Sequence, residues 1–281
     1  MATIAIYSSK GGVGKTTLAV NLAWASATLS SRRTLLWDLD AQAGASFVLA
    51  PKRKHGDEAR AVIERDLSPR KLIVPTSVPN LDLLPADASL RTLDVLFAEI
   101  DSKKRLLKIS EALDKDYDRV IIDCPPGLGV TADQVIRSAD LILLPLIPSS
   151  LASRAAEALV AHLSHKKDAP PVIPVFNLVD RRRIAHKTAL QAAPNQHALP
   201  MTSLVEQMAD RHAPVGAYAP RAPVTAAIGE LWRDIERRLL KKPDERPSSA
   251  SVKIRSNIRA LSSAGSGRPR SSLMLPVGLR G

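Results

Sequence analysis

The chain has 281 residues, 45% of them hydrophobic, which is enough to bury a core in one large domain or two small ones. Its one cysteine, Cys124, excludes a disulfide framework and any cluster of several thiolates, and fits a reducing compartment. The net charge of +12 favours a polyanionic partner, either nucleic acid or an anionic membrane surface. With no signal-like start and no apolar run of bilayer length, we expect a soluble cytoplasmic protein.

Short β-rich apolar runs alternate with helical patterns along the chain. Strands are predicted at residues 3–8, 34–39, 81–86, 119–124, 141–146 and 172–179. Helices are predicted at residues 15–29, 90–113, 131–138, 151–164 and 224–242. This alternation favours an α/β fold, with a mainly parallel twisted sheet covered by helices on both faces.

The composition changes after Pro243, where Ser, Pro, Gly and Arg dominate and no core pattern survives. From Lys241 onward the chain has nine basic and two acidic residues, a net +7 of the total +12. We therefore predict a single domain over residues 1–242 and a disordered basic tail over residues 243–281.

The segment KGGVGKTT lies between the first predicted strand and the first predicted helix. A glycine-rich turn at this place lets backbone N–H groups converge on phosphate oxygens at a helix N-terminus. Gly14, Lys15 and Thr16 fit the second half of the G-x-x-x-x-G-K-[ST] pattern, while Ser9 replaces its first glycine. Lys15 is predicted to bind the β- and γ-phosphates, and the Thr16 hydroxyl to ligate Mg²⁺.

The same loop has a second lysine, Lys10, and KGGVGKTT resembles the deviant Walker A motif of the ParA/MinD family of ATPases. The resemblance covers roughly residues 2–240 and implies a P-loop NTPase fold with ATP and Mg²⁺ as cofactors. It implies that Lys10 reaches across a dimer interface to the other subunit's nucleotide, so that two ATP molecules lie between two chains. The implied nucleotide-binding residues are Lys10, Gly11, Gly12, Val13, Gly14, Lys15, Thr16 and Thr17.

Two further segments carry carboxylates at predicted strand ends, where they can coordinate Mg²⁺ or orient an attacking water. DLDAQ resembles the family's Walker A′ segment and implies that Asp40 is the hydrolytic aspartate, while Ala41 replaces a proline and loosens the turn. DRVIIDCPPGLG resembles Walker B followed by switch II, and implies that Asp123 holds Mg²⁺ through water. The predicted catalytic residues are Lys10, Lys15 and Asp40, and the predicted metal-site residues are Thr16, Asp38, Asp40 and Asp123.

Residues 177–187 supply two further candidate contacts. NLVD is similar to the N-K-x-D pattern that reads guanine, with Leu178 in place of the lysine, and the family resemblance makes Asn177 a candidate adenine contact. The following DRRRIAHK places four basic side chains just beyond a strand end. Many ParA-like proteins bind DNA without sequence preference as ATP dimers, and dimerisation doubles the phosphate contacts. The candidate DNA-binding residues are therefore Arg181, Arg182, Arg183 and Lys187.

The resemblance implies a ParA-type ATPase, nucleoid-associated, that positions or partitions a plasmid, a chromosome or a large protein assembly. It implies slow hydrolysis stimulated by a ParB-like or cargo-adaptor protein. The alternative is a MinD- or FlhG-like membrane ATPase, for which residues 252–261 offer apolar side chains at helical spacing with basic neighbours. Metabolic relatives such as dethiobiotin synthetase fit the Lys10 signature poorly, and iron–sulfur relatives need more cysteines.

Overall fold

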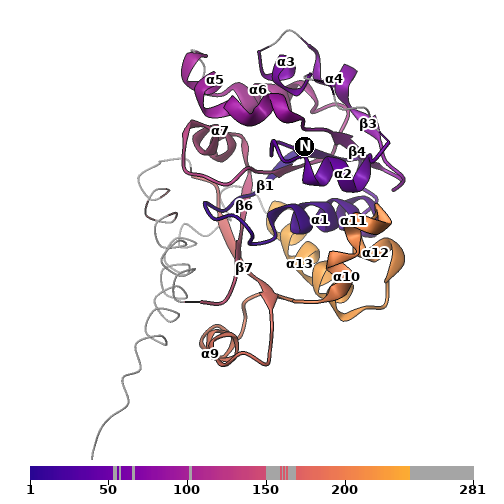
Figure 1. Cartoon of the computed structure of the whole chain (residues 1–281), viewed down its shortest axis with the longest axis vertical. Helices are drawn as coiled ribbons and strands as arrows, with labels where there is room; N and C mark the ends of the chain where they lie inside the picture. The colour runs from indigo at the N-terminus through magenta and orange to yellow at the C-terminus, as the bar shows by residue number, and fades with distance from the viewer. Residues whose placement is uncertain are drawn as a thin grey trace, which may run out of the picture.

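The computed structural model describes residues 1–52, 56, 58–64, 67–100, 103–149, 159, 161, 163 and 169–240. Within these ranges the chain forms an eight-stranded sheet in the order β3-β4-β2-β5-β1-β6-β7-β8 (Figure 1). Neighbouring strands are parallel except for β3, which runs antiparallel to β4. The predicted α/β fold is confirmed. The strands are β1 (Ala2–Ile6), β2 (Thr34–Asp38), β3 (Val74–Pro75), β4 (Leu81–Leu84), β5 (Arg119–Asp123), β6 (Leu141–Leu146), β7 (Val172–Val179) and β8 (Ala198–Pro200).

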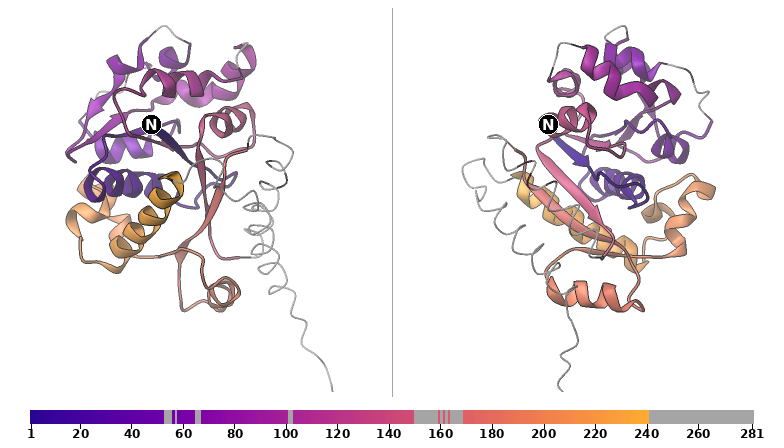
Figure 2. Two further views of the ribbon diagram at one scale, coloured as in Figure 1. Left: turned by 180° about the vertical axis from the view of Figure 1, so that it is seen from behind. Right: turned by 60° about the vertical axis from the view of Figure 1, so that its left-hand side comes forward.

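Helices cover both faces of this sheet, and α1 and α13 lie side by side on one face while α5, α6 and α7 cover the other (Figures 1 and 2). The longer helices are α1 (Lys15–Leu29), α5 (Leu93–Glu99), α6 (Arg105–Ala112), α7 (Val130–Ser138), α9 (Ile184–Ala192) and α13 (Pro223–Leu240). The shorter ones are α2 (Gly44–Leu49), α3 (Ala59–Glu64), α4 (Pro69–Leu72), η1 (Ala88–Thr92), α10 (Ser203–Glu206), α11 (Met208–Arg211) and α12 (Val215–Tyr218).

Side chains alternate along each strand between two hydrophobic cores. On β1, Ile4 and Ile6 pack in the core that contains α1 and α13, whereas Ala5, and Tyr7 just after the strand, pack in the core that contains α5, α6 and α7. Because both faces are covered, the central strands are apolar except near their ends, which is why their runs are recognisable in the sequence.

The helix predicted over residues 90–113 is wrong. The structure has η1, α5 and α6 in its place. Asp87 accepts a hydrogen bond from the Ser89 backbone N–H and caps η1. Ile100 has an extended backbone and ends α5. The pattern shows which side chains are buried, but it does not show that three short segments bury them.

Other predictions fall on residues that the structure does not describe. These are most of the predicted helix 151–164, the end of the last helix at residues 241–242, the domain boundary at 242/243, the tail, and the amphipathic segment 252–261. None of the helices within the described ranges combines the length and apolar character needed to cross a bilayer.

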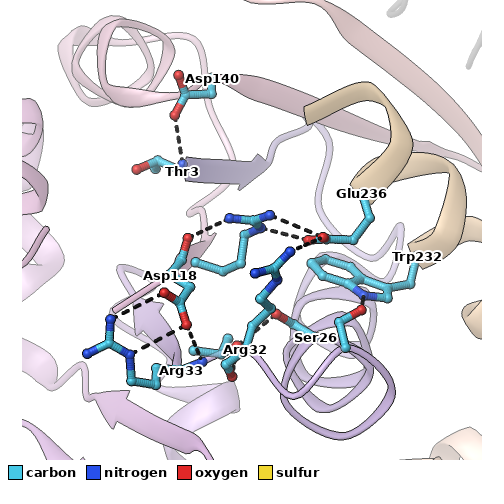
Figure 3. Close-up of polar contacts among 11 residues, drawn as sticks. Thr3, Ser26, Arg32, Arg33, Asp118, Asp140, Trp232 and Glu236 are labelled. Carbon is cyan, nitrogen blue, oxygen red and sulfur yellow. Dashed lines mark hydrogen bonds and ion pairs between the residues drawn. The ribbon is translucent and has the colours of Figure 1, made fainter. Parts of the chain in front are cut away.

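A buried ion-pair network fixes α13 against the amino end of β5 (Figure 3). The Arg119 side chain, in a residue only 8% exposed, donates from Nε to Glu236 Oε1 at 2.7 Å and from Nη2 to Oε2 at 3.1 Å. Arg32 donates to the same carboxylate at 3.3 Å, and the Trp232 indole donates to Ser30 Oγ at 2.8 Å. These contacts lie at the amino ends of the strands, so they support the sheet from the edge opposite the candidate site.

Candidate nucleotide-binding site

The loop between β1 and α1 has the backbone that a phosphate cradle requires. Gly12 has φ +70° and Gly14 has φ +82°, in the left-handed region that favours glycine. A Cβ atom on Gly14 would overlap the side-chain amide of Asn177. The α1 helix begins at Lys15, and its first turn supplies N–H groups that have no intrahelical acceptors. Local sequence thus fixes both the loop and the orientation of its donors.

The two lysines of the loop have different environments. Lys15 is only 7% exposed, and its ammonium Nζ donates to the backbone carbonyl of Lys10 at 3.1 Å. Lys10 is partly exposed on the loop itself. One ammonium is therefore held against the loop backbone, where a phosphate can replace the carbonyl as its partner, while the other has access to solvent. The reach of Lys10 into a second subunit stays a prediction.

Asp38 and Asp123 meet at the carboxyl ends of β2 and β5, where they are partners in the strand register and both are fully buried. Asp38 accepts hydrogen bonds from the Asp40 N–H at 3.1 Å and from the N–H and hydroxyl of Ser46 at 2.9 and 2.8 Å. Burial raises the pKa of Asp38 to about 6, against the lowering effect of the Ser46 hydrogen bonds. Asp38 thus braces the start of α2, a role that the sequence did not reveal.

Asp123 differs from Asp38 in its hydrogen bonding, because neither of its carboxylate oxygens accepts a hydrogen bond from the residues that the structure describes. Burial and the neighbouring Asp38 carboxylate raise the pKa of Asp123 well above its usual range, while the Thr16 hydroxyl and the Lys15 ammonium lower it. A buried oxygen pair without a partner beside a threonine hydroxyl is a donor set that suits Mg²⁺. Within the described part of the chain, no cluster of three His, Cys, Asp or Glu could hold a metal by itself.

Asp40 is the accessible carboxylate of the site. It is partly exposed, and its Oδ1 accepts the Gln42 N–H at 2.9 Å. The turn that lacks the family's proline is closed by the Ala43 N–H, which donates to the Asp40 carbonyl at 2.8 Å. Asp40 borders a cavity of about 250 Å³ that it shares with residues 124–127. An accessible carboxylate at this place can orient a water molecule, whereas the buried ones cannot.

Asn177 lies beneath the phosphate loop. It is 5% exposed, and its Nδ2 donates to the Val13 carbonyl at 2.9 Å. The side chain therefore braces the loop from the end of β7, and the contact with adenine stays a prediction.

The candidate DNA-binding residues are exposed and follow the carboxyl end of β7, with Lys187 on α9. Arg182 forms a bidentate ion pair with Asp180, at 2.9 and 3.0 Å, which neutralises its charge locally. The side chains of Arg181, Arg183 and Lys187 have no ion pair with any described residue. The cluster therefore offers three available cations rather than four.

Two residues near the site were missed by sequence reasoning. The Tyr7 hydroxyl donates to the Gly127 carbonyl at 2.6 Å, and the Asp94 carboxylate accepts the Thr131 N–H at 2.8 Å. A tyrosine at the end of a buried strand signals that its hydroxyl needs a partner, but not which partner. No local pattern marks Asp94.

Comparison with known proteins agrees with the residue pattern. A family model described as an AAA domain matches residues 1–170. The chromosome partitioning protein ParA of Myxococcus xanthus is 39% identical over 146 residues, which are 51% of this chain and 51% of that protein. The chain thus spans about half the length of the curated relatives it matches.

Two solved structures are similar over most of the chain. A cobyrinic acid a,c-diamide synthase from Mycobacterium smegmatis, with bound ATP analogue and magnesium, has a TM-score of 0.72 and 25% identity and covers 86% of this chain and 96% of its own. The cell division ATPase MinD of Pyrococcus furiosus has a TM-score of 0.68 and 25% identity, covering 84% and 98%. Since the family model matches more than half of the 281 residues, the chain belongs to this AAA-domain family, and its relatives place it with the ParA/MinD-type P-loop proteins.

Proposed function

We propose that the chain is a ParA-type ATPase that binds ATP and Mg²⁺, dimerises with ATP and positions or partitions a cargo on the nucleoid. The relatives named as chromosome partitioning proteins support the class. The fold alone is insufficient, because a diamide synthase shares it. The observation that carries the proposal is the pair of lysines in one phosphate loop, one buried and one accessible, beside the orphaned carboxylate of Asp123.

The roles of the residues follow from their positions. Bound ATP would supply the phosphoanhydride that water cleaves, and bound Mg²⁺ would neutralise charge on the phosphate oxygens. The N–H groups of the loop and the Lys15 ammonium would bind phosphate oxygens. Thr16 and Asp123 would hold the metal and its water ligands, and Asp40 would orient the attacking water. Lys10 completes the site of the second subunit, so hydrolysis removes the link between the two chains. A ParB-like or cargo-adaptor protein accelerates this step.

Lys10→Ala tests the shared site. The variant is expected to bind a non-hydrolysable ATP analogue as a monomer and to lose the analogue-dependent dimer, measured by light scattering after gel filtration. Lys15→Ala is the matched control, because it removes the buried phosphate ligand and should lose nucleotide binding itself. Dimerisation of Lys10→Ala at the wild-type analogue concentration would contradict the proposal.

Substitution of Arg181, Arg183 and Lys187 tests whether the dimer binds DNA through this surface. A dimer that uses Arg181, Arg183 and Lys187 makes about six phosphate contacts, so log affinity should fall with log salt with a slope near −5. Replacing the three with alanine should flatten that slope and abolish binding at moderate salt. The control replaces three exposed lysines on and beside α6, at the other end of the molecule from α9 (Figure 1): Lys104, Lys108 and Lys115. If both triple variants lose DNA equally, net charge rather than this surface is responsible.

The alternative that the protein binds membranes can be tested with the same full-length protein. Co-sedimentation with anionic vesicles and with DNA, each with and without the ATP analogue, separates the two. Analogue-dependent binding to vesicles but not to DNA would replace the partitioning proposal with the MinD- or FlhG-like one.

A further inference from the structure

Tyr7 connects the phosphate loop to the segment that follows β5. It comes directly after β1, is 2% exposed, and donates from its hydroxyl to the Gly127 carbonyl at 2.6 Å. Gly127 belongs to residues 125–129, here called the switch loop, which link Asp123 and Cys124 to α7. A side chain at the foot of the phosphate loop thus contacts the loop that follows Asp123.

The switch loop has few supports of its own. Pro126, Gly127, Leu128 and Gly129 are exposed, and the Leu128 side chain is 63% exposed instead of packing in a core. Gly127 has φ +130°, a conformation that residues with a Cβ rarely adopt. Because glycine also adopts many other conformations, the backbone at Gly127 does not by itself hold the loop in place.

Two side chains from other elements hold the loop. Tyr7 holds its middle through the Gly127 carbonyl. Asp94 holds its end, where it accepts the Thr131 N–H and leaves no room for a Cβ on Gly129. Since Asp94 fixes the junction with α7, the hydrogen bond from Tyr7 is the side-chain hydrogen bond that the described residues direct to the centre of the loop.

The position of the loop centre matters because of the cavity of about 250 Å³ beside it. Tyr7, Asp40, Cys124 and Gly127 all line this cavity, and Asp40 is the residue that orients water in the proposed reaction. Burial raises the pKa of Tyr7 to about 12, so its hydroxyl keeps its proton and remains a donor at physiological pH.

We propose that Tyr7 is a positioning residue for ATP hydrolysis: its hydroxyl holds the switch loop at a fixed distance from Asp40 without contributing to nucleotide affinity. This inference rests on the proposed function. It assigns to a residue outside the phosphate-loop motif the control of the turnover step.

Tyr7→Phe is the test, because it removes one oxygen and keeps the buried ring. The matched control is Tyr117→Phe, another buried tyrosine, whose hydroxyl donates to Asp82 at 2.8 Å beside the amino end of β5. One neutral hydrogen bond corresponds to a factor of about three to ten in an equilibrium or a rate. We expect Tyr7→Phe to lower kcat by about that factor with KM for ATP within about twofold of wild type, and Tyr117→Phe to leave kcat unchanged.

Cys124 gives a readout that does not depend on activity. It is the one cysteine of the chain, 1% exposed, and directly precedes the switch loop, so its reaction with Ellman's reagent reports loop opening. In the nucleotide-free protein, Tyr7→Phe should accelerate labelling about three- to tenfold and Tyr117→Phe should not. Unchanged labelling, an equal effect of the two variants, or a loss expressed in KM would overturn the inference. If the wild-type protein hydrolyses no ATP, the proposed function and the positioning role of Tyr7 in hydrolysis fail together, and the labelling experiment alone decides whether Tyr7 anchors the loop.

Discussion

Replacing Asp123 with Asn should stabilise the nucleotide-free protein, against the usual expectation for a buried polar residue. Its two oxygens are fully buried and accept no hydrogen bond of good geometry from the described residues, although the nearby Thr16 hydroxyl and Lys15 ammonium lower its pKa, and Asp38 adds a second carboxylate in register with it. Burial and the neighbouring Asp38 carboxylate raise the pKa of Asp123 well above its usual range, so the charged form of Asp123 is costly in the folded protein. Asn keeps the shape, loses the charge and retains an unsatisfied amide. We therefore expect a gain of about 1–3 kcal/mol in the free energy of unfolding at pH 7.5.

The pH dependence follows from the direction of the two shifts. The folded pKa values of Asp38 and Asp123 are raised, so above about pH 4 the folded state binds more protons than the unfolded state. The contribution of these two groups to the free energy of unfolding is fully present at low pH and is lost as pH rises. For Asp38 it is lost through about pH 6, and for Asp123 the loss continues to higher pH. The Asp123→Asn variant lacks the pH-dependent contribution of Asp123. Its free energy of unfolding should therefore exceed that of the wild type by an amount that grows from pH 4 to pH 7.5.

Urea unfolding at pH 4.5, 6 and 7.5, without nucleotide or Mg²⁺, measures both effects. Asp116→Asn is the control, because this carboxylate is 41% exposed and pairs with Arg70 at the surface, and its change should stay within about 0.5 kcal/mol. Titration with ATP should then show that Mg²⁺ strengthens binding to wild type and not to Asp123→Asn. An Asn variant less stable than wild type by more than about 1 kcal/mol at pH 7.5 would refute the reasoning, since a cost of that size means that Asp123 has a partner.

Three further changes test separate parts of the molecule. Gly14→Ala puts a Cβ against the Asn177 amide at φ +82° and should lower nucleotide affinity at least about tenfold in calorimetry, whereas Gly11→Ala, which meets nothing within 4 Å, should leave the free energy of unfolding unchanged. Asp40→Ala should abolish ATP hydrolysis and trap an ATP-bound dimer, detectable as a dimer that persists after free ATP is removed. Glu236→Gln leaves its buried arginine partner without a carboxylate and should lower the melting temperature by about 6–12 °C, from a loss of about 3 kcal/mol; a shift under about 2 °C would show that the network is not coupled to folding.

The sequence was most informative where chain direction alone determines position. Parallel strands end at the same edge of the sheet, so Asp38 and Asp123, each the last residue of an apolar run, had to lie near the phosphate loop, and the register pairs them directly. The Gly14–Lys15–Thr16 turn was equally predictable, because its backbone requirement and its chemistry lie in adjacent residues.

What the sequence did not show is which polar groups are satisfied. The Ser46 hydroxyl donates a hydrogen bond to Asp38, which lies 8 residues away in the sequence, and it accepts one from the Ala86 N–H, 40 residues away. No periodicity in the sequence predicts such contacts. The sequence placed Asp38 and Asp123 together among the metal-site residues, whereas the structure separates Asp38, which accepts three hydrogen bonds, from Asp123, which accepts none from the described residues. The same limit applies to Arg182, which forms part of a basic run in the sequence but is paired with Asp180 in the fold.

The division between Asp38 and Asp123 bears on how the site can act as a switch. A carboxylate with three hydrogen bonds, such as Asp38, gains little from a cation, whereas Asp123, which accepts no hydrogen bond from the described residues, gains much more. The free energy of metal binding should therefore concentrate at Asp123, the last residue before Cys124 and the switch loop. Metal binding at Asp123 should therefore fix the start of the switch loop, while the Tyr7 hydroxyl fixes its centre. The two contacts can be removed separately. For that reason Asp123→Asn and Tyr7→Phe should be distinguishable: the first should weaken Mg²⁺-dependent affinity, and the second should slow turnover at unchanged affinity.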